Sequence, residues 1–175
     1  GRWSKKEVKV PSESYMRYVL GDYRSLSETD CTVQINIEKE PQELGGPEDW
    51  QIEWKWDGIR IQATCENGVA RIYSRTGDDI SRSFPDLVQA MDFEGSIDGE
   101  LLVGRMENGA IRVGTFGDLQ QRLNRKTVSA KKQTEFPVFV RAYDLLQDGQ
   151  EDLRKLHFDE RRQRLAAFIE NLPED

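Results

Sequence analysis

Residues 50–65 have the sequence WQIEWKWDGIRIQATC, and this stretch decides the fold class. Large apolar side chains alternate with polar ones as far as Asp57, and after Gly58 the alternation resumes. A period of two is typical of a β-strand with one buried and one exposed face. Asn67-Gly68 follows, which is a strong signal for a tight hairpin turn. The stretch therefore predicts a half-buried strand that turns back into a second strand over 69–73.

The rest of the chain contains further strand-like and helix-like segments. Gly45-Gly46-Pro47 is a strong break, so we expect 1–43 to be an N-terminal segment of unknown role and 44–175 the main domain. Asn108-Gly109 predicts a second hairpin turn. Strands joined by hairpins, with helices between them, favour an α+β fold with mainly antiparallel sheets over a doubly wound parallel sheet. Strands are expected at 33–37, 96–103, 110–113 and 137–146, and helices at 12–20, 86–91, 116–123 and 159–172.

Composition excludes several classes of protein. The 175 residues fit one domain, or one domain with an appendage. No apolar run is long enough for a transmembrane helix, so we expect no membrane partner. No apolar signal sequence is visible and the two cysteines form no C-x-x-C pair, so we expect a cytoplasmic protein. The only histidine is His157, which excludes a site with several histidine ligands.

Charge is unevenly distributed along the chain. Residues 112–132 contain six basic residues and one acid, so this segment carries +5 and the remainder −12, for a net charge of −7. A basic patch on an acidic protein can bind a polyanion locally, which makes this segment a candidate nucleic-acid surface. A solvated helix face explains the same charges and stays open as the alternative.

The sharpest chemical cluster surrounds Lys55. Strand alternation places Glu53, Lys55 and Asp57 on one polar face. A lysine is a nucleophile only when it is neutral, and desolvation or a nearby cation such as Arg60 lowers its pKa. Gly58 would allow backbone or a ligand to approach closely. An edge strand whose alternating charges stabilise one another is the alternative interpretation.

Two further groups could bind a ligand. Asp98 and Glu100 lie two apart in an expected strand, so their carboxylates point the same way and repel unless a divalent metal, a ribose hydroxyl or a lysine lies between them. A solvated strand face is again the alternative. Arg75, within Ser74–Gly77 at a strand end, supplies a guanidinium next to hydroxyl groups, as a phosphate or sugar contact requires.

These groups form an ordered series. Residues 55–60 match the pattern K-x-D-G-x-R, and SRTG (74–77), DGE (98–100) and VRAYDLL (140–146) follow. The series closely resembles the adenylation (nucleotidyltransferase) domain of ATP-dependent DNA ligases, most of all the bacterial ones. The segments 116–123 and 160–162 strengthen the resemblance, which covers 44–175.

The resemblance implies a partial ligase nucleotidyltransferase domain with an ATP-grasp-like fold. It also implies that Lys55 attacks ATP to form lysyl-AMP, which activates the 5′-phosphate of nicked double-stranded DNA for sealing. Mg²⁺ or Mn²⁺ would be the cofactor, and the protein would be a monomer. By motif match, Glu53 would bind the adenine amino group and Tyr143 would stack on adenine. Arg60 and Arg75 would contact sugar, phosphates or the DNA end. Glu100 would bind the ribose or help hold the metal.

The series is incomplete by the standard of this family. A second acidic motif, a lysine motif and an OB-fold domain do not occur before Asp175. We therefore expect the isolated chain to be inactive or severely impaired in nick sealing. Two alternatives stay open: an RNA ligase or capping-type nucleotidyltransferase, and a non-catalytic fragment that binds nucleotide or DNA.

Overall fold

The computed structural model describes residues 5–9, 32–36 and 56–172. The chain divides into two units, Gly1–Trp56 and Asp57–Asp175. In the first unit, β1 (Lys5–Lys9) pairs antiparallel with β2 (Thr32–Asn36), which confirms the strand predicted at 33–37 with a shift of one residue. The predicted helix at 12–20 lies outside the described residues, as do most of the predicted strand before Gly58 and both Glu53 and Lys55. The boundary expected after residue 43 stays a prediction.

The predicted hairpin opens the second unit. It consists of β3 (Ile59–Glu66) and β4 (Val69–Ser74), paired antiparallel. Every second residue of β3 from Ile61 to Cys65 is buried. Asn67 and Gly68 have φ angles of 52° and 74°, the left-handed pair that a type I′ turn requires. The prediction that a strand runs through Asp57 is wrong at its end, because Asp57 and Gly58 form a bend before β3 begins.

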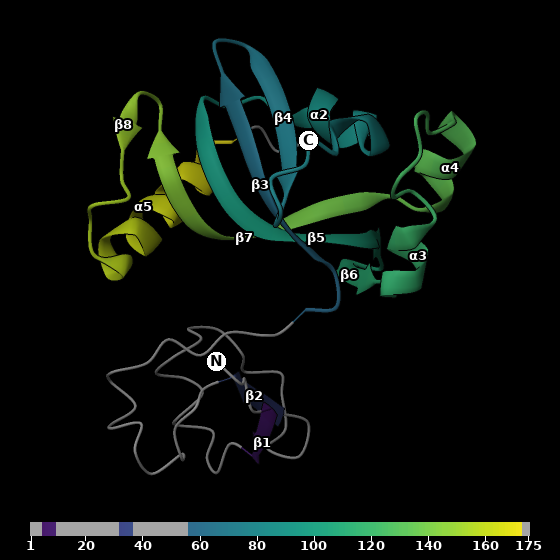
Figure 1. Cartoon of the computed structure of the whole chain (residues 1–175), viewed down its shortest axis with the longest axis horizontal. Helices are drawn as coiled ribbons and strands as arrows, with labels where there is room; N and C mark the ends of the chain where they lie inside the picture. Colours follow the sequence, from purple (N-terminus) through teal and green to yellow (C-terminus); the bar gives the residue numbers. More distant parts are fainter. Residues whose placement is uncertain (1–4, 10–31, 37–55, 173–175) are drawn as a thin grey trace. The chain divides into compact units, whose positions relative to one another are not determined.

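The hairpin is one edge of a larger antiparallel sheet (Figure 1). The strand order is β4-β3-β5-β7-β8, and β6 pairs with the far end of β5. The long central strand β5 pairs with β3 on one side and β7 on the other, and it continues past the predicted end at Val103. The predicted α+β class with an antiparallel sheet is therefore confirmed. The remaining strands are β5 (Gly95–Glu107), β6 (Ala110–Val113), β7 (Val138–Asp148) and β8 (Glu151–Asp152).

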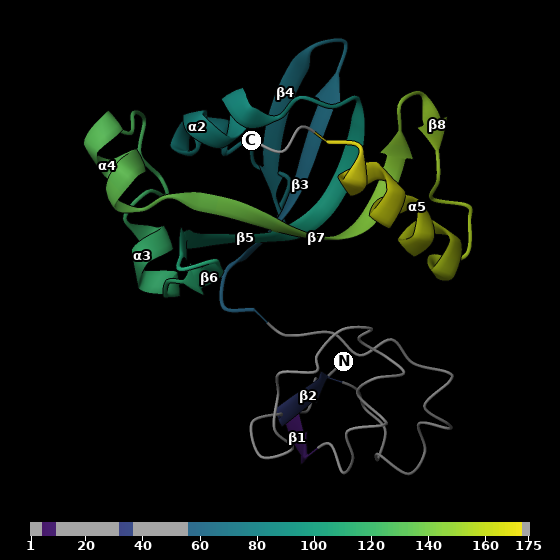
Figure 2. The ribbon, with the colours of Figure 1, turned by 180° about the vertical axis from the view of Figure 1, so that it is seen from behind.

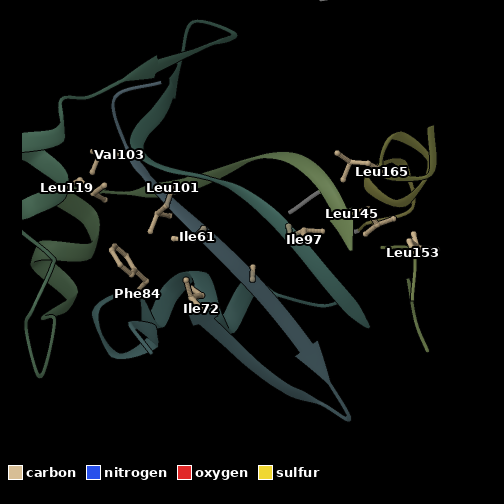
Figure 3. Close-up of a cluster of buried hydrophobic side chains, with 11 residues drawn as sticks. Ile61, Ile72, Phe84, Ile97, Leu101, Val103, Leu119, Leu145, Leu153 and Leu165 are labelled. Carbon is tan, nitrogen blue, oxygen red and sulfur yellow. The ribbon is translucent and has the colours of Figure 1, made fainter. Parts of the chain in front are cut away.

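Several helices pack against this sheet. Within 56–172 the α-helices are α2 (Pro85–Ala90), α3 (Phe116–Gln120), α4 (Ala130–Glu135) and α5 (Phe158–Glu170). Of these, α2 contacts β4, α3 contacts β5 and α5 contacts β7. The sequence predicted all of them except α4, which lacks an apolar period. Leu119 of α3 and Leu165 of α5 join Leu101 of β5 in one buried cluster (Figure 3). In the part of the chain that the structure describes, no helix has the length and apolar character needed to cross a bilayer.

One basic side chain lies in this interior. Arg122 is completely buried, and its guanidinium lies 5.0 Å from the centre of the Phe84 ring. It donates hydrogen bonds to the carbonyl oxygens of Ser83 (3.2 Å) and Phe136 (3.1 Å) and to both carboxylate oxygens of Asp86. Arg122 therefore cannot belong to the nucleic-acid surface predicted over 112–132. Its charge is neutralised by an acid far away in sequence, which a count of charges along the segment does not detect.

The ion pair also changes the acidity of its carboxylate. Burial raises the pKa of Asp86, but the hydrogen bond and charge of Arg122 outweigh that effect, so its pKa lies below the usual value. A carboxylate whose pKa falls on folding stabilises the folded state at pH values above its unfolded pKa, and the contribution disappears as the pH falls through the folded pKa.

We expect Asp86→Asn to destabilise the protein by about 3 kcal/mol at pH 7, because it leaves the Arg122 charge buried without a counterion. The difference from the parent should begin to shrink below about pH 4, the ordinary pKa of an aspartate, and should disappear as the pH falls through the lower folded pKa of Asp86. Urea unfolding at pH 7 and pH 3 measures both effects. The control is Arg71→Gln, which removes an exposed pair with Asp79 and should cost less than ~1 kcal/mol. Equal losses in the two variants at pH 7 would contradict this account.

Candidate functional site

The face of the sheet that points away from the buried cluster carries the charged residues that the sequence singled out. The antiparallel register places Arg60 of β3 opposite Glu100 of β5, and Glu100 opposite Arg141 of β7. In the next row of this face, Gln62 lies opposite Asp98. The residues between them along β3 and β5 are buried, so these polar side chains share one face. We call this surface of β3, β5 and β7 the polar face.

An ion pair organises the centre of the polar face. Arg60 Nη2 lies 3.0 Å from Asp98 Oδ2, and Gln62 Nε2 donates to Asp98 Oδ1 at 3.4 Å. The pKa of Arg60 is raised above its ordinary value, first by the hydrogen bond to Asp98 and further by the acidic groups of Tyr143, Asp98 and Glu100. Arg60 is a cation beside both acids of β5, and the sequence alone did not indicate this partner.

Tyr143 stands at an irregularity of β7. Asp98 pairs with Asp144 and the next residue, Gly99, pairs with Ala142, so Tyr143 is an extra residue on the β7 side. Such a β-bulge bends the strand and changes the direction of a side chain, and bulges are frequent beside functional sites. The half-buried Tyr143 lies close enough to Arg60 to affect its pKa. The structure thus brings Arg60, Glu100 and Tyr143 together from three strands.

Arg75 lies in the turn that follows β4. The preceding residue, Ser74, pairs with Ile61, so Arg75 is at the same end of the hairpin as Arg60. The turn is held by a hydrogen bond from the Gly77 N–H to the Ser74 carbonyl (2.9 Å), and Gly77 has a φ of 87°. The hydroxyls of Ser74 and Thr76 contact each other (3.0 Å) and the Asp78 carboxylate. They therefore stabilise the turn, while the exposed Arg75 projects from it.

Gly58 fits tightly against β5. A Cβ atom at this position would lie 2.3 Å from the carbonyl oxygen of Leu101 and 2.7 Å from Cδ2 of Leu102. Any larger residue would collide with the backbone of the central strand. The close approach predicted for this glycine is therefore confirmed, and the neighbour is backbone. It fixes the point at which the motif segment joins the sheet.

A divalent metal would find a limited set of ligands here. Among the described residues, no group of three or more His, Cys, Asp or Glu side chains is arranged to hold a metal ion. Asp98 is engaged with Arg60 and Gln62. Glu100 supplies a carboxylate on the polar face, which suits Mg²⁺ when substrate phosphates and waters supply its other ligands.

Two polar residues near this face were not predicted from the sequence to belong to the site. Gln62 could have been found, because it follows Arg60 by two residues in the same predicted strand. Asp144 was within a recognised motif but had no assigned role, and it is bound by Arg161 of α5 at 2.9 Å. No local pattern reveals that contact, because it depends on how α5 packs beside β7 (Figure 2).

Comparison with known proteins gives the family. A family model described as "ATP dependent DNA ligase domain" matches residues 32–175. The probable DNA ligase of Koribacter versatilis is 45% identical over 98 residues, which are 54% of this chain and 16% of that protein. DNA ligase C1 of Mycolicibacterium smegmatis is 33% identical over 138 residues, which are 76% of this chain and 38% of that protein. The ligase domain from M. tuberculosis LigD has a TM-score of 0.49 and 27% identity, covering 67% of this chain and 35% of that chain.

The chain belongs to the ATP-dependent DNA ligase family and contains part of its adenylation domain. It spans 16% of the length of the first relative above and 38% of the second. The predicted family is therefore confirmed.

We expect Gly58→Ala to destabilise the protein by about 2 kcal/mol, because the added methyl group overlaps the Leu101 backbone. Chemical denaturation measures the change. Gly117→Ala is the matched control, since its added carbon would come no nearer than 3.4 Å to Thr115 Oγ1 within α3. That variant should be neutral or slightly stabilising, because alanine favours a helix over glycine by about 1 kcal/mol. A Gly58→Ala protein as stable as the parent would refute the close-contact explanation.

Proposed function

We propose that the polar face binds ATP and that Lys55 becomes covalently adenylated. The observation that carries the proposal is the convergence of Arg60, Glu100 and Tyr143 on one surface from three strands. Membership of the ATP-dependent DNA ligase family supports it. The motif that contains Lys55 leads directly into β3, the strand that carries Arg60.

Each residue has a role suited to its chemistry. Tyr143 provides an aromatic face for adenine, and stacking of a base on such a ring is worth about 1–3 kcal/mol. Glu53 accepts a hydrogen bond from the adenine amino group, and Glu100 binds the ribose or a metal ion. Arg60 and Arg75 bind sugar and phosphate oxygens or the DNA end, for which a guanidinium offers several N–H donors.

The reaction forms and breaks one bond at the α-phosphorus. The neutral Nζ of Lys55 attacks this phosphorus, a P–N bond forms, the P–O bond to the β-phosphate breaks and pyrophosphate leaves. The Lys55 ammonium group first releases a proton to water, since only the neutral amine can attack, and the nitrogen releases a second proton to water once the P–N bond has formed. A pKa below the ordinary value of about 10.4 would raise the neutral fraction. Mg²⁺ held by Glu100 and the phosphates would neutralise negative charge on the triphosphate.

The adenylate is an activated group for the next step. We propose that AMP passes from Lys55 to the 5′-phosphate at a nick in double-stranded DNA, and that the 3′-hydroxyl then displaces AMP. The exposed basic residues of 112–132, without the buried Arg122, are the proposed DNA surface. Arg112, Arg125, Lys126 and Lys131 are exposed around β6, α3 and α4.

Adenylation should require the Lys55 amine. With α-labelled ATP and Mg²⁺, we expect a version of the chain extended at its C-terminus to retain label, and its Lys55→Ala variant to lose all of it, since no P–N bond can form there. The control is Lys155→Ala, an exposed lysine outside the motifs, which should label like the parent. GTP should give no label. Label retained on the Lys55→Ala protein would refute the assigned nucleophile.

DNA binding should depend on the basic segment. We expect the double variant Lys126→Ala with Lys131→Ala to weaken binding to a nicked duplex and to reduce the salt slope of log K by about 2, since each lost phosphate contact removes about 0.9. Lys155→Ala is the control, because this exposed lysine lies between β8 and α5, at the end of the unit opposite to α4 (Figure 1). Fluorescence anisotropy at several salt concentrations measures the slope. An unchanged slope in the double variant would exclude this surface.

A further inference from the structure

Two consecutive arginines of α5 hold the β7 bulge. The Arg161 guanidinium contacts both carboxylate oxygens of Asp144, from Nε at 2.9 Å and from Nη2 at 3.2 Å, and its Nη1 donates to the Leu156 carbonyl at 2.8 Å. Arg162 Nη1 donates to the carbonyl oxygen of Tyr143. The bulge residue and the residue after it are therefore both bound by α5.

The helix that carries these arginines has its own anchors. Leu165 is buried in the apolar cluster, and the Phe168 ring meets the Phe93 ring edge to face, with centroids 5.5 Å apart. These contacts lie further along α5 than Arg161 and do not involve the polar face. The position of α5 is thus fixed by the core, and its arginines present a fixed set of donors to β7.

The bulge needs such a support because of the charges around it. Asp144 lies directly opposite Asp98 in the register, and like charges opposite each other destabilise antiparallel pairing. Each of the two carboxylates has its own arginine: Asp98 is bound by Arg60 and Asp144 by Arg161. Without Arg161, repulsion favours moving the extra residue to another place in β7, and a shift by one residue turns a side chain to the other face of the sheet.

We propose that Arg161, Asp144 and Arg162 form a clamp that fixes the bulge so that the Tyr143 ring faces the adenine of bound ATP. This inference rests on the proposed nucleotide site and adds α5 to it. The three are positioning residues, which set the affinity for the base through the direction of Tyr143. Arg161 and Asp144 are each less than one-fifth exposed, at 18% and 17%, so the pair is shielded enough to be a firm contact.

The test compares binding of ATP with binding of tripolyphosphate, which lacks the base. By isothermal titration calorimetry on the full chain with Mg²⁺, Arg161→Gln should weaken ATP binding by about 3- to 10-fold, a part of the stacking contribution. Tripolyphosphate should bind the variant and the parent equally. Equal weakening of both ligands would overturn the clamp, since it would indicate general damage to the site. Should Arg161→Gln fail to fold, Arg162→Gln removes the other half of the clamp, the hydrogen bond to the Tyr143 carbonyl, and carries the same expectations.

The matched control is Arg164→Gln. Arg164 also ties α5 to the sheet, through Asp148 (3.1 Å) and Glu151 (2.8 Å), but away from Tyr143. Its loss should leave the affinity for ATP unchanged. ATP binding weakened as much by Arg164→Gln as by Arg161→Gln would overturn the proposal, because the effect would then follow from loosening α5 in general.

A double-mutant cycle separates this inference from the proposed function. In a Tyr143→Ala background, Arg161→Gln should not weaken ATP binding further, because there is no ring left to position. Independent, additive losses would overturn the clamp and leave the nucleotide site intact. A parent chain that binds neither ATP nor tripolyphosphate would overturn the proposed function itself, and the clamp with it.

Discussion

The pairing of β5 with strands on both sides is the constraint on which the rest of the second unit depends. It requires a close approach at Gly99, where a Cβ atom would lie 2.7 Å from Val140 Cγ1 and 2.8 Å from the Arg141 carbonyl oxygen. Because Gly99 has no side chain on the core side, β7 can lie against β5 there. Asp98 and Glu100 flank it in sequence and therefore project from the opposite, polar face. Gly99 therefore allows the two strands to pair closely, while Asp98 and Glu100 provide polar side chains on the opposite face.

The polar face balances its charges before any ligand binds. Asp98 is 15% exposed and tied to Arg60, whose own side chain is 56% exposed. A guanidinium has five N–H donors, so one contact to Asp98 fixes its direction and leaves donors for phosphate oxygens. Arg161 approaches Asp144 from α5, which packs against β7. Two acids that face each other across a strand pair are thereby neutralised by cations from different elements.

Local sequence patterns predicted the strands. The features that these patterns did not predict depend on contacts between residues far apart in the sequence. Alternation from Ile59 to Cys65 and the two Asn-Gly turns suffice for the hairpins, because the period and the turn geometry are properties of short segments. Arg122 was misjudged because its partner Asp86 is 36 residues away and only folding brings them together. The bulge at Tyr143 did leave a signal: core positions in β7 step by two up to Ala142 and then by three to Leu145. No sequence signal indicated that Arg161 and Arg162 of α5 bind this bulge.

The length of β5 connects the two surfaces to which we assign function. Its first half carries Asp98 and Glu100 on the polar face, and its last residues pair with β6 beside α3 (Figure 1). At about 3.3 Å per residue, a strand of this length spans roughly 40 Å, comparable to a turn of duplex DNA. The basic residues that we propose to bind DNA lie on β6 and around α3 and α4, and both β6 and α3 contact β5. The central strand therefore connects the proposed DNA surface to the polar face that we propose as the nucleotide site.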